Sequence, residues 1–432
     1  MTPSLPPGPR RPALAQAFAL WRHPVPFFDD CRRRFGETFT LRLPTRPPYV
    51  FFSHPDAVKD IFGGDPDTLR AGEASVILEP ILGPNSLLLL DGPRHLRERR
   101  LMLPSFHGER MAVYGEIMRS ITERAIDRWP IGAAFPIHAE MQQITLDVIF
   151  RTVFGFDDSP ALAPLRDRLT RLVGSIANAA TLMPFMQWDL GPRSPWGRYV
   201  RLRRETHELL GAAIEARRNG DGSGDDVLSI LLLARDEDGQ PMTDAELRDQ
   251  MITLLLAGHE TTATALTWTF HHLFANPAIL EHALGELREG TPDELLDAIA
   301  KESLRLTPIV PEVGRMLDTP LRIGDWDLPA GVVAAPSIYL AHRRPERWPE
   351  PDRFDPERFL GSRPTPYEFF PFGGGVRRCL GMAFALYEMR IVLATILSRV
   401  SIRAAEPGPA RIVRRSITLA PEGGVPVVVE AR

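Results

Sequence analysis

One long helical stretch constrains the fold of this chain more than any other feature of its sequence. It opens with Thr243 and Glu246, a capping-box pair in which the hydroxyl and the carboxylate satisfy each other's free backbone N–H groups, and it stops at Asn276 before Pro277. Roughly 33 residues at about 1.5 Å each make a rod of roughly 50 Å, which is long enough to cross a whole domain. A chain built around such a rod is expected to be mainly helical.

Strand-like runs flank this helical region on both sides. They cover residues 38–43, 49–53, 321–323, 332–336 and 425–429. No repeat of fixed period and no long low-complexity tract divides the chain, and the Gly-rich stretch 219–225 is predicted to be a surface loop. We therefore expect a mainly α fold with a smaller β region, formed by residues 1–432 as a single domain without a fused reductase.

Composition and charge exclude several classes of function. A formal charge of -4 at pH 7 gives no global basic field for nucleic acid or anionic lipid. The 2 cysteines, Cys31 and Cys379, are too few for a disulfide framework, a four-cysteine zinc site or an iron–sulfur cluster. The Pro-rich N-terminus contains no apolar run of membrane-spanning length. We expect a cytoplasmic monomer that binds no nucleic acid and has no membrane anchor.

The middle of the long helix departs from the pattern of a buried helix. The apolar residues 254–256 are followed by Ala257, Gly258, His259, Glu260, Thr261 and Thr262. Gly and Thr lower helix propensity, and a buried carboxylate needs a partner. Such departures are most frequent at functional sites, although a kinked helix with a capped carboxylate would give the same pattern.

A second unusual segment is the Gly-rich loop 372–381, which leads into a predicted helix over residues 382–400. Cys379 lies just before that helix, where free N–H groups and the helix dipole favour a thiolate. Such a thiolate would be a strong metal ligand, and the glycines would let the backbone approach a flat ligand closely. Taken alone, an isolated cysteine of this kind is more often structural.

The loop resembles the heme-binding signature of the cytochrome P450 family. The signature is Phe, two residues, Gly, one residue, Arg, one residue, Cys, one residue, Gly, and its positions are filled by Phe372, Gly375, Arg377, Cys379 and Gly381. The resemblance implies the cytochrome P450 fold and a heme b cofactor with Cys379 as the axial thiolate, which favours O–O cleavage. It also implies that Phe372 packs near the sulfur and that Arg377 pairs with a heme propionate.

Upstream of the loop, three residues resemble the structural triad of the same family. Glu302 and Arg305 have the i,i+3 spacing that puts an acid and a base on one helix face, and Arg358 supplies the usual third partner. Each pair alone could be a solvated surface ion pair, which contributes little stability. Together, and in this order before Cys379, they are predicted to lie behind the heme.

The middle of the long helix matches another element of the family, in which an acid and a threonine manage proton delivery to dioxygen. By resemblance, Ala257 and Gly258 border the heme, with Gly258 leaving room for O2, Thr261 holds the O2 by a hydrogen bond, and Glu260 relays protons from solvent. A zinc-protease motif is excluded here, because the second histidine that it requires after His259 is Ala263.

Two further places are predicted to neutralise the heme propionates. His95 and Arg99 lie i and i+4 apart on one helix face, and they resemble the family's His-x-x-x-Arg element. Arg315 matches the remaining propionate-binding arginine. A charged run of this kind is otherwise a solvated helix face.

The resemblance implies a monooxygenase that activates O2 and hydroxylates or epoxidises an apolar small molecule such as a fatty acid, terpenoid, steroid or polyketide. The segments expected to contact this substrate are 76–90, 172–188, 309–313 and 417–419. Electrons are expected from a ferredoxin with its ferredoxin reductase, or from a flavodoxin-type donor. The donor would dock near Cys379 on a basic patch formed by Arg94, Arg97, Arg100 and Arg378.

Two alternatives use the same cysteine. A heme-thiolate isomerase or peroxygenase would not need the acid and threonine, and a noncatalytic heme sensor would need neither these residues nor an apolar pocket. Glu260 and Thr261 therefore favour the monooxygenase.

Overall fold

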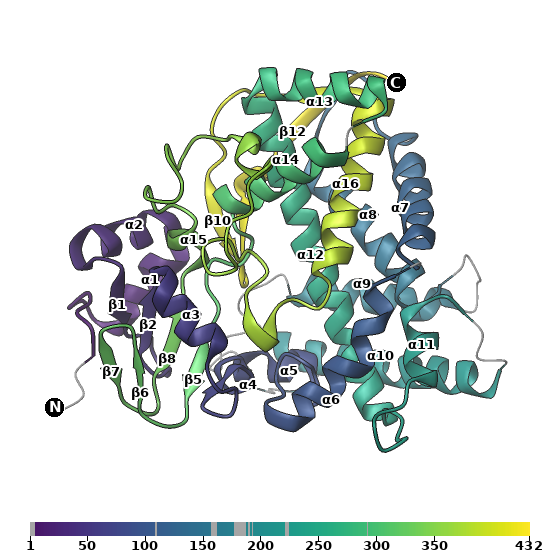
Figure 1. The fold of residues 1–432 in the computed structure, drawn as a ribbon. Coiled ribbons are helices and arrows are strands. Elements are labelled where there is room, and N and C mark those ends of the chain that lie inside the picture. Colours follow the sequence, from purple (N-terminus) through teal and green to yellow (C-terminus); the bar gives the residue numbers. More distant parts are fainter. Residues whose placement is uncertain are drawn as a thin grey trace.

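The computed structural model describes residues 5–108, 110–156, 162–176, 187–188, 191, 193–220, 224–291 and 293–432. Within them the chain is mainly helical with a smaller β region, as predicted (Figure 1). The helices are α1 Ala13–Arg22, α2 Pro24–Phe35, α3 Pro55–Gly63, α4 Ala71–Ala74, α5 Glu79–Leu82, α6 Gly92–Met102, α7 Arg110–Ile126, α8 Ile137–Thr152, α9 Ala163–Ile176, α10 Pro195–Asn219, α11 Val227–Leu233, α12 Asp244–Ala275, α13 Pro277–Glu289, α14 Asp293–Leu306, α15 Ile338–Ala341 and α16 Met382–Arg399.

Helix α12 is the predicted rod, and its 32 residues form the centre of the helical body. The capping box is present: the N–H of Thr243 donates to the carboxylate of Glu246 over 2.8 Å, and the N–H of Glu246 donates to the hydroxyl of Thr243 over 3.2 Å. The helix ends at Asn276, as the following proline predicts. Helices α8, α14 and α16 pack against it, so most of its length is buried.

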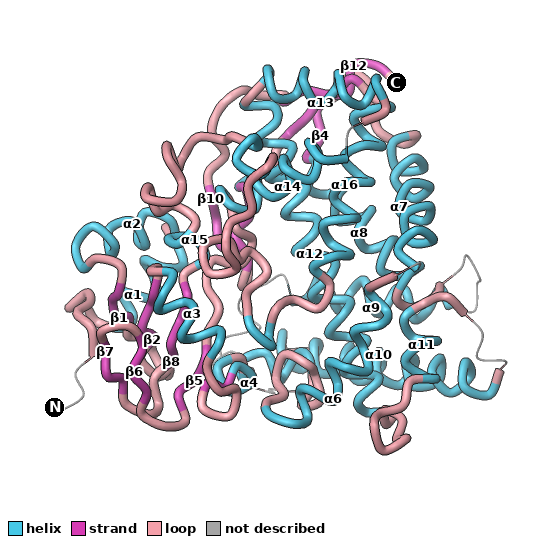
Figure 2. The backbone as a smooth tube through the Cα atoms, in the orientation of Figure 1, coloured by secondary structure: helices cyan, strands magenta, loops and turns pink. Residues whose placement is uncertain are grey.

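The largest sheet lies on one side of the helical body, while β4 and β12 lie near α13 at the top of the view (Figure 2). The strands are β1 Thr38–Leu41, β2 Tyr49–Phe52, β3 Leu69–Arg70, β4 Ala134–Pro136, β5 Arg315–Leu317, β6 Leu321–Ile323, β7 Trp326–Leu328, β8 Val333–Pro336, β9 Ser401–Ala404, β10 Ile412–Arg415, β11 Thr418–Pro421 and β12 Pro426–Ala431. The largest sheet has the order β1-β2-β8-β5-β3, in which the pair β2 and β8 is parallel and the others are antiparallel. This pairing joins the beginning of the chain to its last third.

The predicted strands agree with the structure to within one or two residues at each end. The run 38–43 is shortened to β1, and the run 425–429 is shifted to begin at Pro426. Of the predicted loop 219–225, the described residues 219, 220, 224 and 225 are exposed, while 221–223 lie outside the described residues. Among the described helices, none is long and apolar enough to cross a membrane.

Candidate active site

Cys379 lies in the turn that precedes α16. Its backbone N–H donates to the carbonyl of Phe372 over 2.9 Å, which closes the loop, and its side chain is accessible although protein surrounds it. Burial raises the pKa of the Cys379 thiol, and the N–H of Gly381 and the charges of Arg99 and Arg378 oppose this shift. A backbone N–H group and nearby positive charges therefore favour the thiolate, but in the protein alone the desolvation of the sulfur has the larger effect on the pKa.

Two glycines of the loop pack closely against α3. A Cβ atom on Gly374 would lie 2.2 Å from the ring of Phe62 in α3, and one on Gly375 would lie 2.2 Å from the carbonyl oxygen of Phe62. Gly375 also has a φ of 64°, which side chains rarely adopt. These two glycines therefore let the loop pack against α3. Gly381, in contrast, has open space at its Cβ position, with nothing within 4 Å.

Arg377 connects the cysteine loop to the segment before α6. Its guanidinium donates to the carbonyls of Leu87, over 3.1 Å, and of Leu90, and it forms an ion pair with Asp91. The carboxylate of Asp91 also accepts the N–H groups of Gly72, over 2.9 Å, and Glu73, over 3.0 Å. One carboxylate thus fixes both Arg377 and the start of α4.

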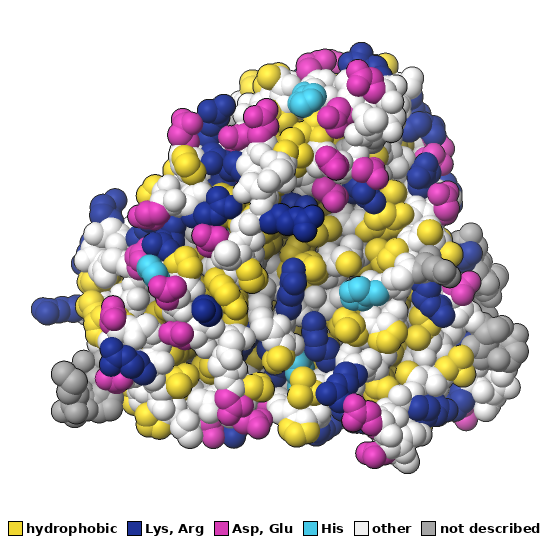
Figure 3. Space-filling view, in the orientation of Figure 1, with side chains coloured by type: hydrophobic (Ala, Val, Ile, Leu, Met, Phe, Trp, Pro, Cys, Tyr) yellow, Lys and Arg dark blue, Asp and Glu magenta, His cyan; other side chains and the backbone are white. Residues whose placement is uncertain are grey.

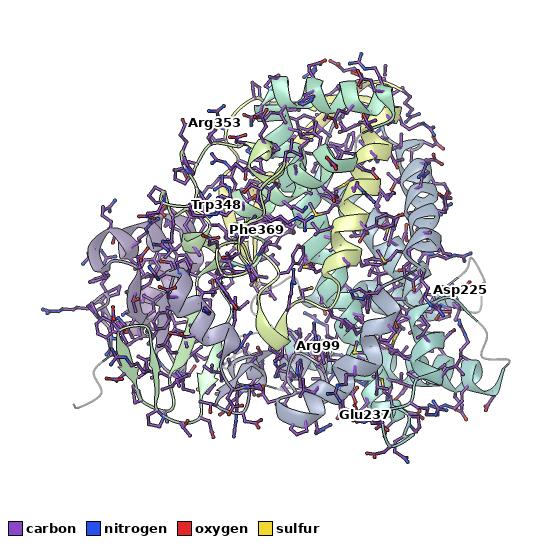
Figure 4. The ribbon with its side chains drawn as sticks, in the orientation of Figure 1. Arg99, Asp225, Glu237, Trp348, Arg353 and Phe369 are labelled. Atoms are coloured by element: carbon purple, nitrogen blue, oxygen red, sulfur yellow. The ribbon has the colours of Figure 1, made fainter. Side chains whose placement is uncertain are left out.

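The predicted propionate-binding residues lie in one positively charged cluster. His95 is buried, and its pKa falls to about 3, first because of burial and then because Arg377, Arg99 and Arg315 surround it. Arg315 is also buried, and burial followed by repulsion from Arg377 lowers its pKa to about 10. Arg99, near the centre of the view in Figure 4, is half-buried, and its pKa is lowered by burial.

The cluster contains more positive charge than its own carboxylate neutralises. Asp91 pairs with Arg377, whereas Arg315 donates only to the carbonyls of Gly314 and Gly374, and Arg99 has no acidic partner in the described part of the chain. Buried cations without acidic partners are costly unless an anion completes the site. The donor set therefore fits a group that carries carboxylates, as heme does through its two propionates.

The middle of α12 is accessible on one face although the helix is otherwise largely buried. Ala257 is exposed and Thr261, one turn later, is partly exposed, with its hydroxyl donating to the carbonyl of Ala257 over 2.5 Å. Gly258 lies on the side of the helix that packs on α8, because a Cβ atom there would lie 2.8 Å from the side chain of Ile149. The structure explains Gly258 by this close packing of α12 on α8, and the open position belongs to Ala257.

Glu260 is held by α8, and among the described residues its carboxylate bonds to Gln142 while the hydroxyl of Thr261 donates to Ala257. Its carboxylate accepts a hydrogen bond from the amide of Gln142 over 2.6 Å and lies 3.7 Å from Nε2 of His138. Burial alone would raise the pKa of Glu260, but its interactions with His138 and Gln142 outweigh burial and lower the pKa. Glu260 is therefore a carboxylate near neutral pH, and it is partly accessible.

Glu302, Arg305 and Arg358 meet as predicted, in the interior of the protein. Arg305 donates to both carboxylate oxygens of Glu302, over 2.7 Å and 2.8 Å, and the Nε of Arg358 lies 3.5 Å from the same carboxylate. The side chains of Glu302 and Arg305 are both 0% exposed. This burial excludes the alternative of a solvated surface pair.

His342 is a site residue that sequence reasoning missed. Its Nε2 accepts the N–H of Phe370 over 2.9 Å, and its carbonyl accepts a hydrogen bond from Arg305 over 2.9 Å. Its ring also stacks on Phe369, which Figure 4 labels beside Trp348. His342 thus connects the buried ion pair to the chain two residues before Phe372. No pattern in the sequence marks this histidine, because its partners are far away along the chain.

The burial of His342 predicts a loss of stability in acid. Burial, followed by the charges of Arg305 and Arg343, holds the pKa of His342 well below the ordinary 6.5, so only the unfolded chain takes up this proton as the pH falls below about 6.5. Between pH 7 and pH 5 the free energy of unfolding should therefore fall by about 2 kcal/mol through this residue.

Urea unfolding of the His342→Gln variant tests this prediction. The amide oxygen of the glutamine can still accept the N–H of Phe370, and the variant should lack the contribution of His342 to the decrease. The exposed His282 provides the control, because His282→Gln should keep the wild-type pH dependence. An unchanged dependence in His342→Gln would contradict the prediction.

The predicted docking patch is partly neutralised by carboxylates. Arg97 pairs with Asp236 over 2.6 Å and with Glu98 over 2.5 Å, and Arg100 pairs with Glu237 over 2.5 Å. These two arginines were predicted to contribute to a basic patch, but their charges are offset because an acidic turn that is distant in sequence folds against α6. Basic side chains still run down the middle of the face in Figure 3. Of the predicted patch, Arg378 is exposed and without an acidic partner among the described residues.

The expected substrate-contacting segments are brought together only in part. The N–H of Leu419 donates to the carbonyl of Ile309 over 2.8 Å, and the indole of Trp268 in α12 donates to the carbonyl of Leu419 over 2.9 Å. Segments 309–313 and 417–419 therefore lie side by side against α12. In the segment 172–188, residues 177–186 lie outside the described residues.

The chain is similar to known proteins over nearly its whole length. The family described as Cytochrome P450 matches residues 5–425. A Mycobacterium tuberculosis protein named cytochrome P450 135B1 is 42% identical over 99% of this chain and 92% of its own length, and cytochrome P450 135A1 of the same species is 38% identical over 98% and 95%. Retinoic acid bound cyanobacterial CYP120A1 superposes with a TM-score of 0.86 at 25% identity, covering 99% of both chains. The heme domain of cytochrome P450DA superposes with a TM-score of 0.84 at 25% identity, over 99% of this chain and 98% of its own. This chain therefore belongs to the cytochrome P450 family of heme b monooxygenases.

Proposed function

We propose that this monooxygenase hydroxylates or epoxidises an apolar small molecule and receives its electrons from separate proteins in the cytoplasm. The observation that carries the proposal is the juxtaposition of Cys379 with a cluster of arginines that lack acidic partners in the described chain. When bound, heme supplies O2 activation at an iron held by a thiolate. The thiolate would come from Cys379, and the propionates would be held by His95, Arg99, Arg315 and Arg377. Phe372 and Gly381 would border the ligand.

Thr261 and Glu260 would manage protons on the α12 side. Thr261 is partly accessible on the same face as Ala257, so its hydroxyl can turn from the carbonyl of Ala257 toward a bound oxygen molecule. Glu260 is charged near neutral pH and partly accessible, so its carboxylate can take up a proton from solvent. The two side chains bond to different partners, and the carboxylate of Glu260 would have to leave Gln142 to bond to Thr261.

An apolar substrate is supported by the side chains of the segments around α12. Ile309 is buried, Ile417 is exposed and Leu419 is buried, which gives this region a largely apolar character. The structural relative CYP120A1 is a retinoic acid bound protein, and its ligand is a mainly apolar molecule with one carboxylate. Fatty acids, terpenoids, steroids and polyketides have the same overall character.

Electron delivery would occur on the face that carries Cys379. An acidic ferredoxin served by its reductase, or an acidic flavodoxin-type donor, would be attracted by Arg378. Because Arg97 and Arg100 are already paired, reversing their charges would break internal contacts as well as change the surface.

The assignment of Cys379 is tested by the absorbance of the reduced protein with carbon monoxide. Cys379→His should still admit heme but lose the red-shifted Soret band of a thiolate ligand, together with turnover. Cys31, buried in α2, provides the control, and Cys31→Ala should keep the band. A Cys379→His protein that kept both the band and its turnover would show that another residue holds the iron.

A further inference from the structure

Helix α1 presents an apolar stripe to solvent. Leu14 is 75% exposed, Phe18 is 69% exposed and Trp21 is 39% exposed. Their spacings of four and three residues place the three side chains on one face of the helix. Isolated exposed apolar residues are ordinary, but three large ones aligned on a short helix form a patch that marks an interaction site.

The buried face of the same helix carries a polar side chain. Gln16 is only 1% exposed, and its amide donates to the carbonyls of Pro9, over 3.1 Å, and Arg11, over 2.7 Å. Its amide oxygen accepts the N–H of Arg42 over 3.0 Å. These three hydrogen bonds fix which face of α1 is turned inward. The usual arrangement of a surface helix, with apolar residues inward and polar residues outward, is therefore partly reversed.

The stripe is bordered by positive charge. The first acidic residue of the chain is Asp29, so the sequence up to the end of α1 contains no negative side chain. Arg10 and Arg11, just before α1, and Arg22, at its end, are exposed, and none of them has an acidic partner among the residues that the structure describes. An apolar stripe with guanidinium groups at both ends of its helix is complementary to a bilayer surface, which has an apolar interior and anionic head groups.

We propose that α1 docks the protein on the surface of an anionic lipid bilayer, with Leu14, Phe18 and Trp21 inserted among the acyl chains. The surrounding arginines would contact lipid phosphates. Such a helix lies in the plane of the interface, and it does not span the bilayer. Attraction to anionic lipid would strengthen the contact at low salt.

A second copy of this chain fits the stripe less well. A two-fold contact would bring the same arginines of both copies together, and like charges oppose such a contact. A stable dimer also needs about 800 Å² of interface on each partner, far more than one ten-residue helix offers. A bilayer needs neither a matching shape nor a large interface.

The experiment is flotation of the heme-loaded, full-length protein with vesicles of phosphatidylglycerol or of phosphatidylcholine. We expect binding to phosphatidylglycerol vesicles that weakens as salt increases, with little binding to phosphatidylcholine. The double variant Leu14→Ser with Phe18→Ser should bind at least tenfold more weakly, because two inserted apolar side chains are lost. The triple variant Arg10→Gln, Arg11→Gln and Arg22→Gln should lose the salt dependence.

The control variant is Leu233→Ser, which removes an equally exposed apolar side chain, 68% exposed, at the end of α11. It should bind vesicles like the wild type. All of the substituted residues are exposed, so the Soret spectrum and thermal unfolding should be unchanged in every variant. Equal binding of wild type and the double variant would overturn the proposal. So would a concentration-dependent dimer, or a complex with a soluble acidic protein, that the double variant abolishes while vesicle binding is absent.

Discussion

Replacing Glu302 with alanine is expected to destabilise the folded protein by about 3–5 kcal/mol, because Arg305 would remain buried without its carboxylate. Arg305 would keep its hydrogen bonds to the carbonyls of His342, Pro351 and Arg353, but these groups do not balance its charge. A domain is typically stable by about 5–15 kcal/mol, so the loss would consume a large part of the total. The effect should reach the heme site, since Arg305 contacts His342 and His342 holds the N–H of Phe370.

Urea unfolding and the yield of heme-loaded protein measure this effect. The matched control is Glu350→Ala, which breaks the pair between Glu350, 71% exposed, and Arg353, 63% exposed. That surface pair should contribute less than about 1 kcal/mol. If Glu302→Ala unfolded at nearly the same urea concentration as Glu350→Ala, the buried pair would not be the structural support proposed here.

Local patterns predicted those features whose partners lie close together in the sequence. The capping box of α12, its end at Asn276 and the i,i+3 pair of Glu302 and Arg305 all depend on residues within one or two turns of each other. The family resemblance predicted the fold class, the cofactor and the contact of Arg358 with Glu302, which are 56 positions apart. It could do so because a family motif relates residues that are distant in the sequence, whereas hydrophobic periodicity relates only near neighbours.

The features that could not be predicted depend on partners far away in the sequence. Arg97 is neutralised by Asp236, 139 positions later, so its charge could not be assigned to a free surface. Positions 374 and 375 leave no room for a side chain because Phe62 lies against them, and Ile149 lies against Gly258 in the same way. In each case the residue type indicated a close approach, but only the tertiary fold identified the approaching group.

The accessible face of α12 allows a direct test of proton delivery. Thr261→Ala should continue to consume reductant and O2 while releasing hydrogen peroxide in place of product, because the hydroxyl that we propose to hold the oxygen molecule is lost. Glu260→Gln should slow turnover without releasing as much peroxide, because the carboxylate that we propose to take up a proton is lost while Thr261 remains. One proton-transfer group accounts for roughly 10²–10⁴-fold in rate, so product formation should fall by about 10²-fold or more in each variant.

The measurement compares product formed with reductant consumed, together with the peroxide released. Thr269 provides a matched control, since its hydroxyl donates to the carbonyl of Ala265 over 2.8 Å, as that of Thr261 does to Ala257, but Thr269 is fully buried two turns away. Thr269→Ala should therefore keep wild-type coupling. If Thr261→Ala also kept it and Glu260→Gln kept the wild-type turnover rate, the Gly, Glu and Thr residues in the middle of α12 would serve only its packing against α8. Loss of coupling in Thr261→Ala together with a wild-type turnover rate in Glu260→Gln would assign proton uptake to a route that does not use Glu260, and the hydrogen bond from Gln142 would then be a purely structural contact.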